Sequence, residues 1–314
     1  MATATGTADN YLDVLTKLRD FLVSTGSWSV VGGKATGAFV NDTEFVSLKG
    51  TGLTGTDAIY ITLQPFSAPA NNAYSIRVKG HTAYVNPGIV QPGSDSRWCY
   101  LLMLNSPMTY WFVANGRRFI AAIKSGSRYD AMYAGFILPE HLPNDWSYPL
   151  FIGASSYTGS QSQATDDLVH SNFWNPIATG SSNNEASGSV LFSPMQQWIL
   201  VRNGYPSSGS VSVTETGRFT IPWSLTCLQN LRPQLDGQVW LKRGQLVCCD
   251  RTYSSVDNNV PEGGMFYGSF DGVFYAPAFG STAEQEVTYS GVTYKMFPNV
   301  GRTSDGQFAA IAME

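Results

Sequence analysis

Charged side chains are scarce in this chain of 314 residues. Lys, Arg, Asp and Glu make up 13% of it, about half of the roughly 25% usual for soluble globular proteins. The 19 basic residues are scattered, and the net charge is −4. Because contacts to a phosphate backbone depend on clustered Lys and Arg, the composition argues against nucleic acid as a partner. A surface poor in charge but rich in small hydroxyl and amide groups favours packing into a large assembly.

The sequence also lacks long apolar runs. No run approaches the ~20 residues of a membrane span, and the opening "MATATGTADN" has no basic region followed by an apolar one, as a signal peptide would. We therefore expect no membrane span and synthesis in the cytoplasm.

Residues that carry chemistry are few and isolated. No C-x-x-C spacing occurs, which argues against a zinc or redox site. We expect free and mostly buried thiols at Cys99, Cys227, Cys248 and Cys249. The three histidines lie in different segments and are expected at the surface or in loops: His81, His141 and His170. We predict no catalytic residue and no metal site.

A glycine motif, "GTGLTG" from Gly50 to Gly55, matches the G-x-G-x-x-G pattern of dinucleotide-binding proteins. That pattern requires a helix to follow it, whereas "TDAIYITLQ" is typical of a strand. We interpret the motif as a connection between two strands and predict no cofactor.

Glycan chemistry leaves two alternatives to weigh. A glycan hydrolase needs two carboxylates about 5 to 10 Å apart, and the candidates are Asp166, Asp167, Glu262, Glu284 and Glu286. None has the apolar surroundings that raise the pKa of a general acid, so we interpret them as solvated charges. An aromatic surface for stacking on sugars would need Tyr267, Phe270 or Tyr275 to face outward, whereas aromatic residues on strands usually belong to a core or an interface.

One segment near the start predicts an α-helix. In "DNYLDVLTKLRDFLVSTGSW", apolar residues recur at three- and four-residue spacing, the pattern of one helical face. Asp9 is expected to cap the first turn and Gly26 to end the helix. An apolar stripe should pack against a sheet or a second copy of the helix. Its members are Leu12, Leu15, Leu18 and Leu22.

After residue 28, short runs rich in Val, Ile, Tyr, Phe and Thr alternate with Gly, Pro, Asn and Asp, which predicts strands. The fold class is therefore a β-rich α+β protein, an N-terminal helix followed by a mainly antiparallel β body in two lobes. The expected divisions are a helix plus β lobe over 1–152, a polar loop region over 153–190 and a C-terminal β lobe over 191–314.

The segment "TYWFVANGRRFIAAI" predicts a hairpin around Asn115-Gly116, a pair that suits a type I′ turn. Side chains alternate across a strand, so both faces of the first strand are apolar. We expect its own chain to cover both faces, or a neighbouring subunit to cover one of them. Arg117 and Arg118 should point to opposite faces, one exposed and one paired. With the helix stripe, the predicted core or interface positions are Leu12, Leu15, Leu18, Leu22, Tyr110, Trp111, Phe112, Tyr129, Tyr133 and Phe136.

An ordered set of segments resembles the virion structural proteins of tailed bacteriophages and prophages. These segments are "LKGTGLTGTDAIYI" (48–61), "MTYWFVANGRRFIAAIKSGSRYDAMYAGFILP" (108–139), "YPLFIG" (148–153), "GSFDGVFYAPAF" (268–279) and "YKMFPNVGRTSDGQFAAIAME" (294–314). They span nearly the whole chain.

The resemblance implies a non-enzymatic structural component of the virion tail, in the baseplate or fibre-attachment region, assembled in the host cytoplasm. Its partners would be other virion tail proteins, and it would form a symmetric homo-oligomer. The alternatives are a receptor- or glycan-binding module at the tail tip, a neck- or head-associated structural protein, and a tail-associated glycan hydrolase.

Overall fold

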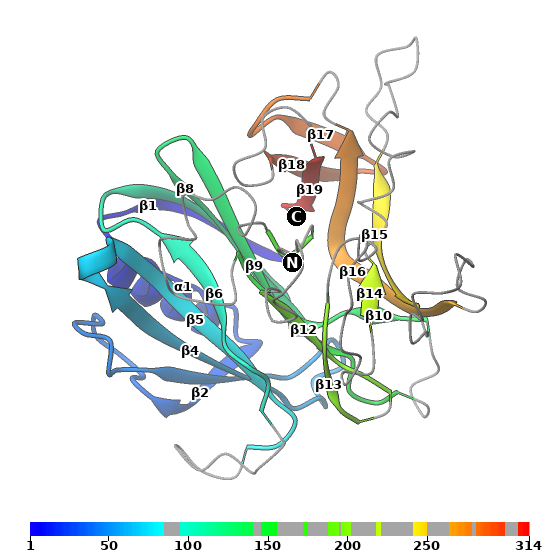
Figure 1. Cartoon of the computed structure of the whole chain (residues 1–314), viewed down its shortest axis with the longest axis horizontal. Coiled ribbons are helices and arrows are strands. Elements are labelled where there is room, and N and C mark those ends of the chain that lie inside the picture. The colour runs from blue at the N-terminus through cyan, green and yellow to red at the C-terminus, as the bar shows by residue number, and fades with distance from the viewer. Residues whose placement is uncertain are drawn as a thin grey trace, which may run out of the picture.

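The computed structural model describes residues 1–84, 95–140, 146–155, 172–174, 188–194, 196–201, 218–220, 241–249, 264–277, 281–298 and 307–313. Within them, one α-helix near the N-terminus is followed by strands of three antiparallel sheets (Figure 1). The predicted β-rich α+β class is confirmed. We call the sheets the helix-side sheet, the central sheet and the C-terminal sheet.

The helix α1 runs from Tyr11 to Ser24. The Asn10 side chain caps it, because its Oδ1 accepts hydrogen bonds from the backbone N–H groups of Leu12 and Asp13, each at 3.0 Å. The prediction of Asp9 as the cap is therefore wrong by one residue. Gly26 follows the helix with φ of +72°, a left-handed conformation that glycine adopts without strain, as expected for its end.

The central sheet has seven strands in the order β1-β7-β8-β9-β11-β12-β13. Its middle is a continuous antiparallel meander from residue 108 to residue 136. The strands are β1 (Ala2–Ala8), β7 (Met108–Ala114), β8 (Arg118–Ser125), β9 (Arg128–Phe136), β11 (Leu150–Gly153), β12 (Ser189–Phe192) and β13 (Trp198–Leu200).

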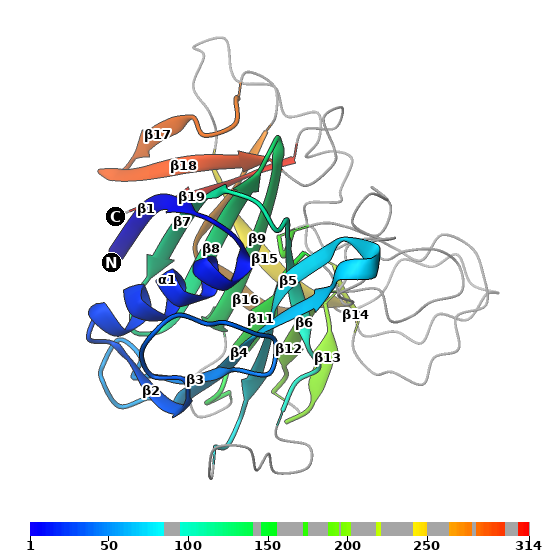
Figure 2. The same cartoon turned by 90° about the vertical axis from the view of Figure 1, so that its left-hand side faces the viewer.

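The helix-side sheet lies across α1 from the central sheet (Figure 2). It has the order β2-β3-β4-β5-β6. Its strands, with the short 3-10 helix η1 (Pro69–Asn71) between β4 and β5, are β2 (Trp28–Gly33), β3 (Val46–Gly50), β4 (Ile59–Ala68), β5 (Ala73–His81) and β6 (Cys99–Met103). β3 and β4 flank Gly50 to Gly55, so that glycine motif connects two strands as predicted.

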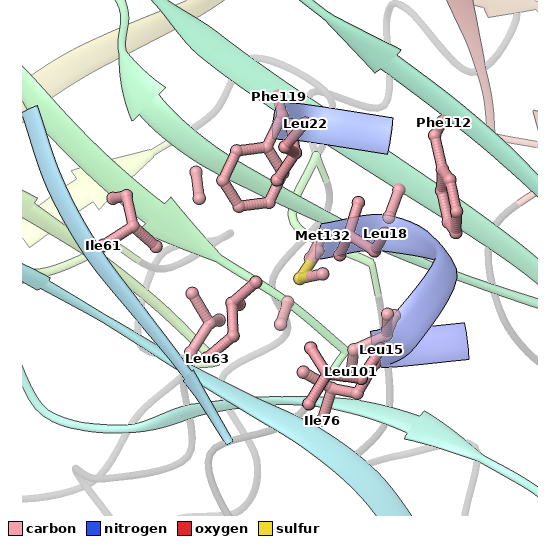
Figure 3. Packing of buried hydrophobic residues seen from close by; sticks show 14 of the residues in the cluster. Leu15, Leu18, Leu22, Ile61, Leu63, Ile76, Leu101, Phe112, Phe119 and Met132 are labelled. Carbon is pink, nitrogen blue, oxygen red and sulfur yellow. The ribbon is translucent and has the colours of Figure 1, made fainter. Parts of the chain in front are cut away.

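A first apolar core fills the space between these two sheets. Leu15, Leu18 and Leu22 of α1 are fully buried in it. Figure 3 shows them beside residues of both sheets, Ile61, Leu63, Ile76 and Leu101 from the helix-side sheet and Phe112, Phe119 and Met132 from the central sheet. The predicted stripe therefore packs inside its own chain.

The C-terminal sheet packs on the opposite face of the central sheet. Its strands follow the order β14-β15-β16-β19-β18-β17, and β10 pairs with β16. They are β10 (Leu138–Pro139), β14 (Arg218–Thr220), β15 (Lys242–Cys249), β16 (Gly264–Pro277), β17 (Glu286–Tyr289), β18 (Val292–Pro298) and β19 (Gln307–Ala312). Ser290 and Gly291, both at positive φ, join β17 to β18 in a tight hairpin.

Both faces of the β7-β8 hairpin are buried within the chain. Phe112 and Phe119 belong to the core beside α1, whereas Trp111 and Ile120 belong to a second core beneath the C-terminal sheet. Of the two arrangements left open by the sequence, the structure has the chain covering both faces. The apolar character of this hairpin thus gives no reason to invoke a neighbouring subunit.

The turn of this hairpin is not type I′. Asn115 N–H donates to the Arg118 carbonyl at 3.0 Å, and neither Asn115 nor Gly116 has a positive φ. Glycine is needed because a Cβ on Gly116 would lie 2.0 Å from the Gly52 carbonyl oxygen. A contact remote in sequence, rather than local backbone freedom, therefore explains this Asn-Gly pair.

The predicted division into two lobes stays a prediction. β12, which begins at the end of the predicted polar loop region, and β13 belong to the same sheet as β1, β7, β8, β9 and β11 of the first part. Most of the loop region itself lies outside the described residues.

We expect Asn10→Ala to lower the free energy of unfolding by about 1 kcal/mol, because two backbone N–H groups lose their acceptor. Urea denaturation measures the change. Asp9→Ala is the matched control, and it should change stability by less than about 0.5 kcal/mol. Equal losses in the two variants would contradict the assignment of the cap.

Candidate functional site

The outer face of the helix-side sheet carries the most distinctive group of partly exposed side chains. Strand alternation separates it from the core, because Ile59, Ile61 and Leu63 face α1 and their neighbours on β4 face outward. Antiparallel pairing sets the outward residues of β4, β5 and β6 side by side. They include the partly exposed Tyr60, Gln64, Phe66, Arg77, Lys79 and Tyr100 and the buried Thr62, Ser75 and His81.

Two cations of this face, Arg77 and Lys79, lie over the ring of Trp98, the residue just before β6. Its ring centroid lies 4.5 Å from Arg77 Cζ and 4.6 Å from Lys79 Nζ. The Arg77 guanidinium is also 5.7 Å from the ring centroid of Phe66. Cations at such distances over a ring are attracted by its negative face. We call Phe66, Arg77, Lys79, Asp95 and Trp98 the Trp98 patch.

Polar contacts fix the orientation of the patch. Arg77 Nη2 donates to Gln64 Oε1 at 2.8 Å, and Lys79 Nζ lies 2.5 Å from Asp95 Oδ2. With two cations and one carboxylate, the patch has a net positive charge on a chain of net charge −4. The Trp98 and Phe66 rings are half-buried. Exposed ring faces beside cations can stack on a flat ligand and pair with a carboxylate, sulfate or phosphate.

A buried polar chain lies next to the patch. Ser47 Oγ is 2.8 Å from Thr62 Oγ1, which is 2.8 Å from His81 Nε2. Tyr148 Oη, from the segment before β11, is 2.7 Å from the His81 carbonyl oxygen. The expectation of a surface or loop position for His81 is therefore wrong, since this residue lies on β5 with 2% of its surface exposed.

Burial, the largest cause, and the nearby Lys79 ammonium together lower the pKa of His81 to about 4, while Asp95 acts in the opposite direction. The imidazole is therefore neutral at pH 7. Among the residues that the structure describes, its Nδ1 has no hydrogen-bond partner, and no carboxylate hydrogen-bonds to it as in a catalytic triad. The hydrogen bonds from Ser47 through Thr62 to His81 link strands β3, β4 and β5.

Two further polar clusters join the central and C-terminal sheets. Arg118 is fully buried, and its Nε donates to the Asp271 carbonyl at 3.0 Å. This confirms the expected pairing of one arginine of the hairpin. Glu284 Oε1 lies 2.5 Å from both Lys124 Nζ and Tyr129 Oη. Despite some desolvation, its bonds to Lys124 and Tyr129 lower the pKa of Glu284, so this carboxylate is an ionised partner and not a general acid.

The ten predicted core or interface positions divide between the two cores. Eight are buried, and Leu12 and Tyr110 are half-buried. Those beside α1 are Leu12, Leu15, Leu18, Leu22, Tyr110, Phe112 and Phe136. Those beneath the C-terminal sheet are Trp111, Tyr129 and Tyr133.

The structure excludes the alternative of a sugar-stacking surface formed by three aromatic residues of β16 and gives them the core position expected of aromatic residues on strands. Tyr267, Phe270 and Tyr275 are all buried against the central sheet. Strand alternation fails there because Gly268 and Gly272 have φ of +154° and +72°, which turns the chain so that these rings share a face.

Of the carboxylate candidates, the two that the structure describes each pair with a lysine. Glu286 lies 2.8 Å from Lys295, and Glu284 belongs to the cluster with Lys124. Asp166, Asp167 and Glu262 lie outside the described residues, as do His141, His170 and Cys227. Cys99 is buried as predicted, and burial raises the pKa of its thiol to about 12.

The sequence offered only a partial signal for the Trp98 patch. Arg77 and Lys79 are two residues apart on a predicted strand and so share a face. Trp98 is about twenty residues further along, beyond a connection whose pairing no local pattern specifies.

Comparison with known proteins gives no assignment. No protein-family model matches the chain, and no curated protein matches it. Among the described residues, no helix is both long and apolar enough to cross a membrane. The same residues contain no group of three or more His, Cys, Asp or Glu side chains placed to hold a metal ion.

We expect His81 to make the protein less stable in acid. Its pKa is 6.5 in an unfolded chain and about 4 in the folded protein, so between these values only the unfolded state binds the proton. The free energy of unfolding should therefore fall by about 3 kcal/mol between pH 7 and pH 4 because of this group. Urea denaturation at several pH values should show a smaller loss in His81→Gln. Identical pH profiles for the two proteins would rule out the effect.

Proposed function

We propose that the chain is a non-enzymatic structural component of a tailed-bacteriophage virion, placed in the tail at the baseplate or fibre-attachment region. The observation that carries this proposal is the ordered set of segments resembling virion proteins. The longest of these segments, residues 108–139, contains β7, β8 and β9, the strands on which both other sheets pack. The segments at 268–279 and 294–314 contain β19 and most of β16 and β18. These strands cover one face of β7, β8 and β9.

In this role the chain acts through contacts with other virion tail proteins and with copies of itself. The Trp98 patch supports such contacts, because half-buried rings beside a cation suit a protein interface, where Trp and Arg are enriched. An anionic or aromatic surface on a neighbouring tail protein would complement it.

We expect the chain in purified tailed particles at a fixed ratio to the other tail proteins. Particles from the bacterium that carries the gene would be purified on a density gradient and analysed by quantitative mass spectrometry. A gold-labelled antibody would then locate the chain, with binding expected at the tail. Particles that lack the chain would contradict the proposal.

A receptor- or glycan-binding module at the tail tip is the second candidate, and the Trp98 patch favours it. Trp98 can stack on the apolar face of a sugar ring, while Arg77 and Lys79 can pair with acidic groups of the same glycan. Such a ligand would be an anionic polysaccharide of the bacterial surface.

For this candidate, Trp98→Ala should weaken binding to polysaccharide extracted from the host surface at least about fivefold, since one stacked ring contributes roughly 1 kcal/mol or more. Isothermal titration calorimetry would measure it. Tyr289→Ala removes an exposed aromatic ring from β17 and serves as the matched control. Equal affinity in the wild type and Trp98→Ala would exclude the patch as a glycan site.

A further inference from the structure

The strand β1 forms one end of the central sheet. It pairs with β7 over its whole length, from Ala2 opposite Ala114 to Ala8 opposite Met108, without a register shift. In an antiparallel ladder every second residue directs its N–H and C=O away from the neighbour. In the described part of the chain no strand pairs with the outer edge of β1, so this edge offers unused donors and acceptors.

The sequence of this edge strand lacks the features that usually prevent association. Natural edge strands are short, bulged, charged or interrupted by proline, whereas "ATATGTA" is seven residues long, uncharged and regular. The side chains of Thr3, Thr5 and Thr7 are exposed. One side chain reaches the strand, since Lys17 Nζ donates to the Thr7 carbonyl at 2.8 Å. A carbonyl has two acceptor positions, so this contact is compatible with further pairing.

The sequence of β1 is nearly the same read from either end. An antiparallel pairing of two copies about Thr5 sets like residues opposite each other: Ala2 and Ala8, Thr3 and Thr7, Ala4 and Gly6, Thr5 and Thr5. Gly6 is the one departure from this symmetry, and the first core explains it. A Cβ on Gly6 would lie 2.6 Å from Tyr110 Oη, so an alanine there would require the Tyr110 ring that covers the strand to shift.

We propose that β1 pairs antiparallel with β1 of a second copy of this chain, about a two-fold axis through Thr5, and joins two central sheets into one. The interface is isologous, as in most homodimers. Opposed threonines form favourable cross-strand pairs, and the edge hydrogen bonds are made in both copies. The inference rests on the proposed function in taking self-assembly as part of the role of the chain, and it identifies the surface that performs it.

Light scattering after size exclusion, at about 1 to 100 µM protein, tests the pairing. The wild type should have twice the monomer mass of 34.1 kDa, or a multiple of it. Thr5→Lys sets like charges opposite each other, as does Thr5→Glu, so each variant alone should lose the pairing and halve the mass. An equimolar mixture of the two should restore it, because Lys then meets Glu across the axis.

Thr288→Lys is the matched control, since Thr288 is an exposed threonine on β17 and the charge change is the same. It should leave the mass unchanged, and circular dichroism should show all variants folded. A monomeric wild type, or a mass that Thr5→Lys does not change, would overturn the proposed pairing. Either result would leave the presence of the chain in purified particles, which is a separate measurement, unaffected.

Discussion

The fold depends on one requirement, that neither face of the β7-β8-β9 meander can be left in water. Phe112, Phe119 and Met132 make one face apolar, and Trp111, Ile120 and Tyr133 make the other so. A fully buried large side chain contributes roughly 1.5 to 3 kcal/mol, so covering both faces dominates the energetics. α1 and the helix-side sheet cover one face and the C-terminal sheet covers the other. The outer face of the helix-side sheet is left to polar side chains, and the Trp98 patch lies there.

The turn at residues 115–118 makes hydrogen bonds that join the three sheets. The Asn115 carbonyl accepts a hydrogen bond from Trp28 Nε1 at 2.7 Å, and Asn115 Nδ2 donates to Asp271 Oδ2 at 2.8 Å. Its Oδ1 accepts from the backbone of Arg117 and Arg118. The side-chain oxygen of Asn115 thus bonds its own turn. The backbone carbonyl of Asn115 bonds the helix-side sheet, and its side-chain amide bonds the C-terminal sheet. The buried charge of Arg118 is stabilised at the same place by Asp271.

Local patterns predict the parts of this fold that local forces decide. The spacing of leucines gave α1 and its buried face, and alternating β-branched and aromatic residues gave most strands. β1 was missed because its small residues carry no apolar alternation and it forms only by pairing with β7. The type I′ turn at Asn115-Gly116 was wrong because the contact with Gly52 decides the conformation there. Local patterns could not predict the Trp98 patch, because the pairing of β5 with β6 brings its residues together and depends on the whole sheet.

The arrangement of the cores has a consequence for the order of synthesis. The helix α1 and the helix-side sheet, which cover the α1 side of the meander, lie within residues 11–103, so most of that core can close while the ribosome is still adding later residues. The face that carries Trp111 and Ile120 stays uncovered until β16 and β19 are synthesised, more than a hundred residues downstream. Until residues 264–311 emerge, the nascent chain displays an apolar sheet face. Premature termination in that interval would release an aggregation-prone fragment, which is a natural substrate for chaperones and proteases.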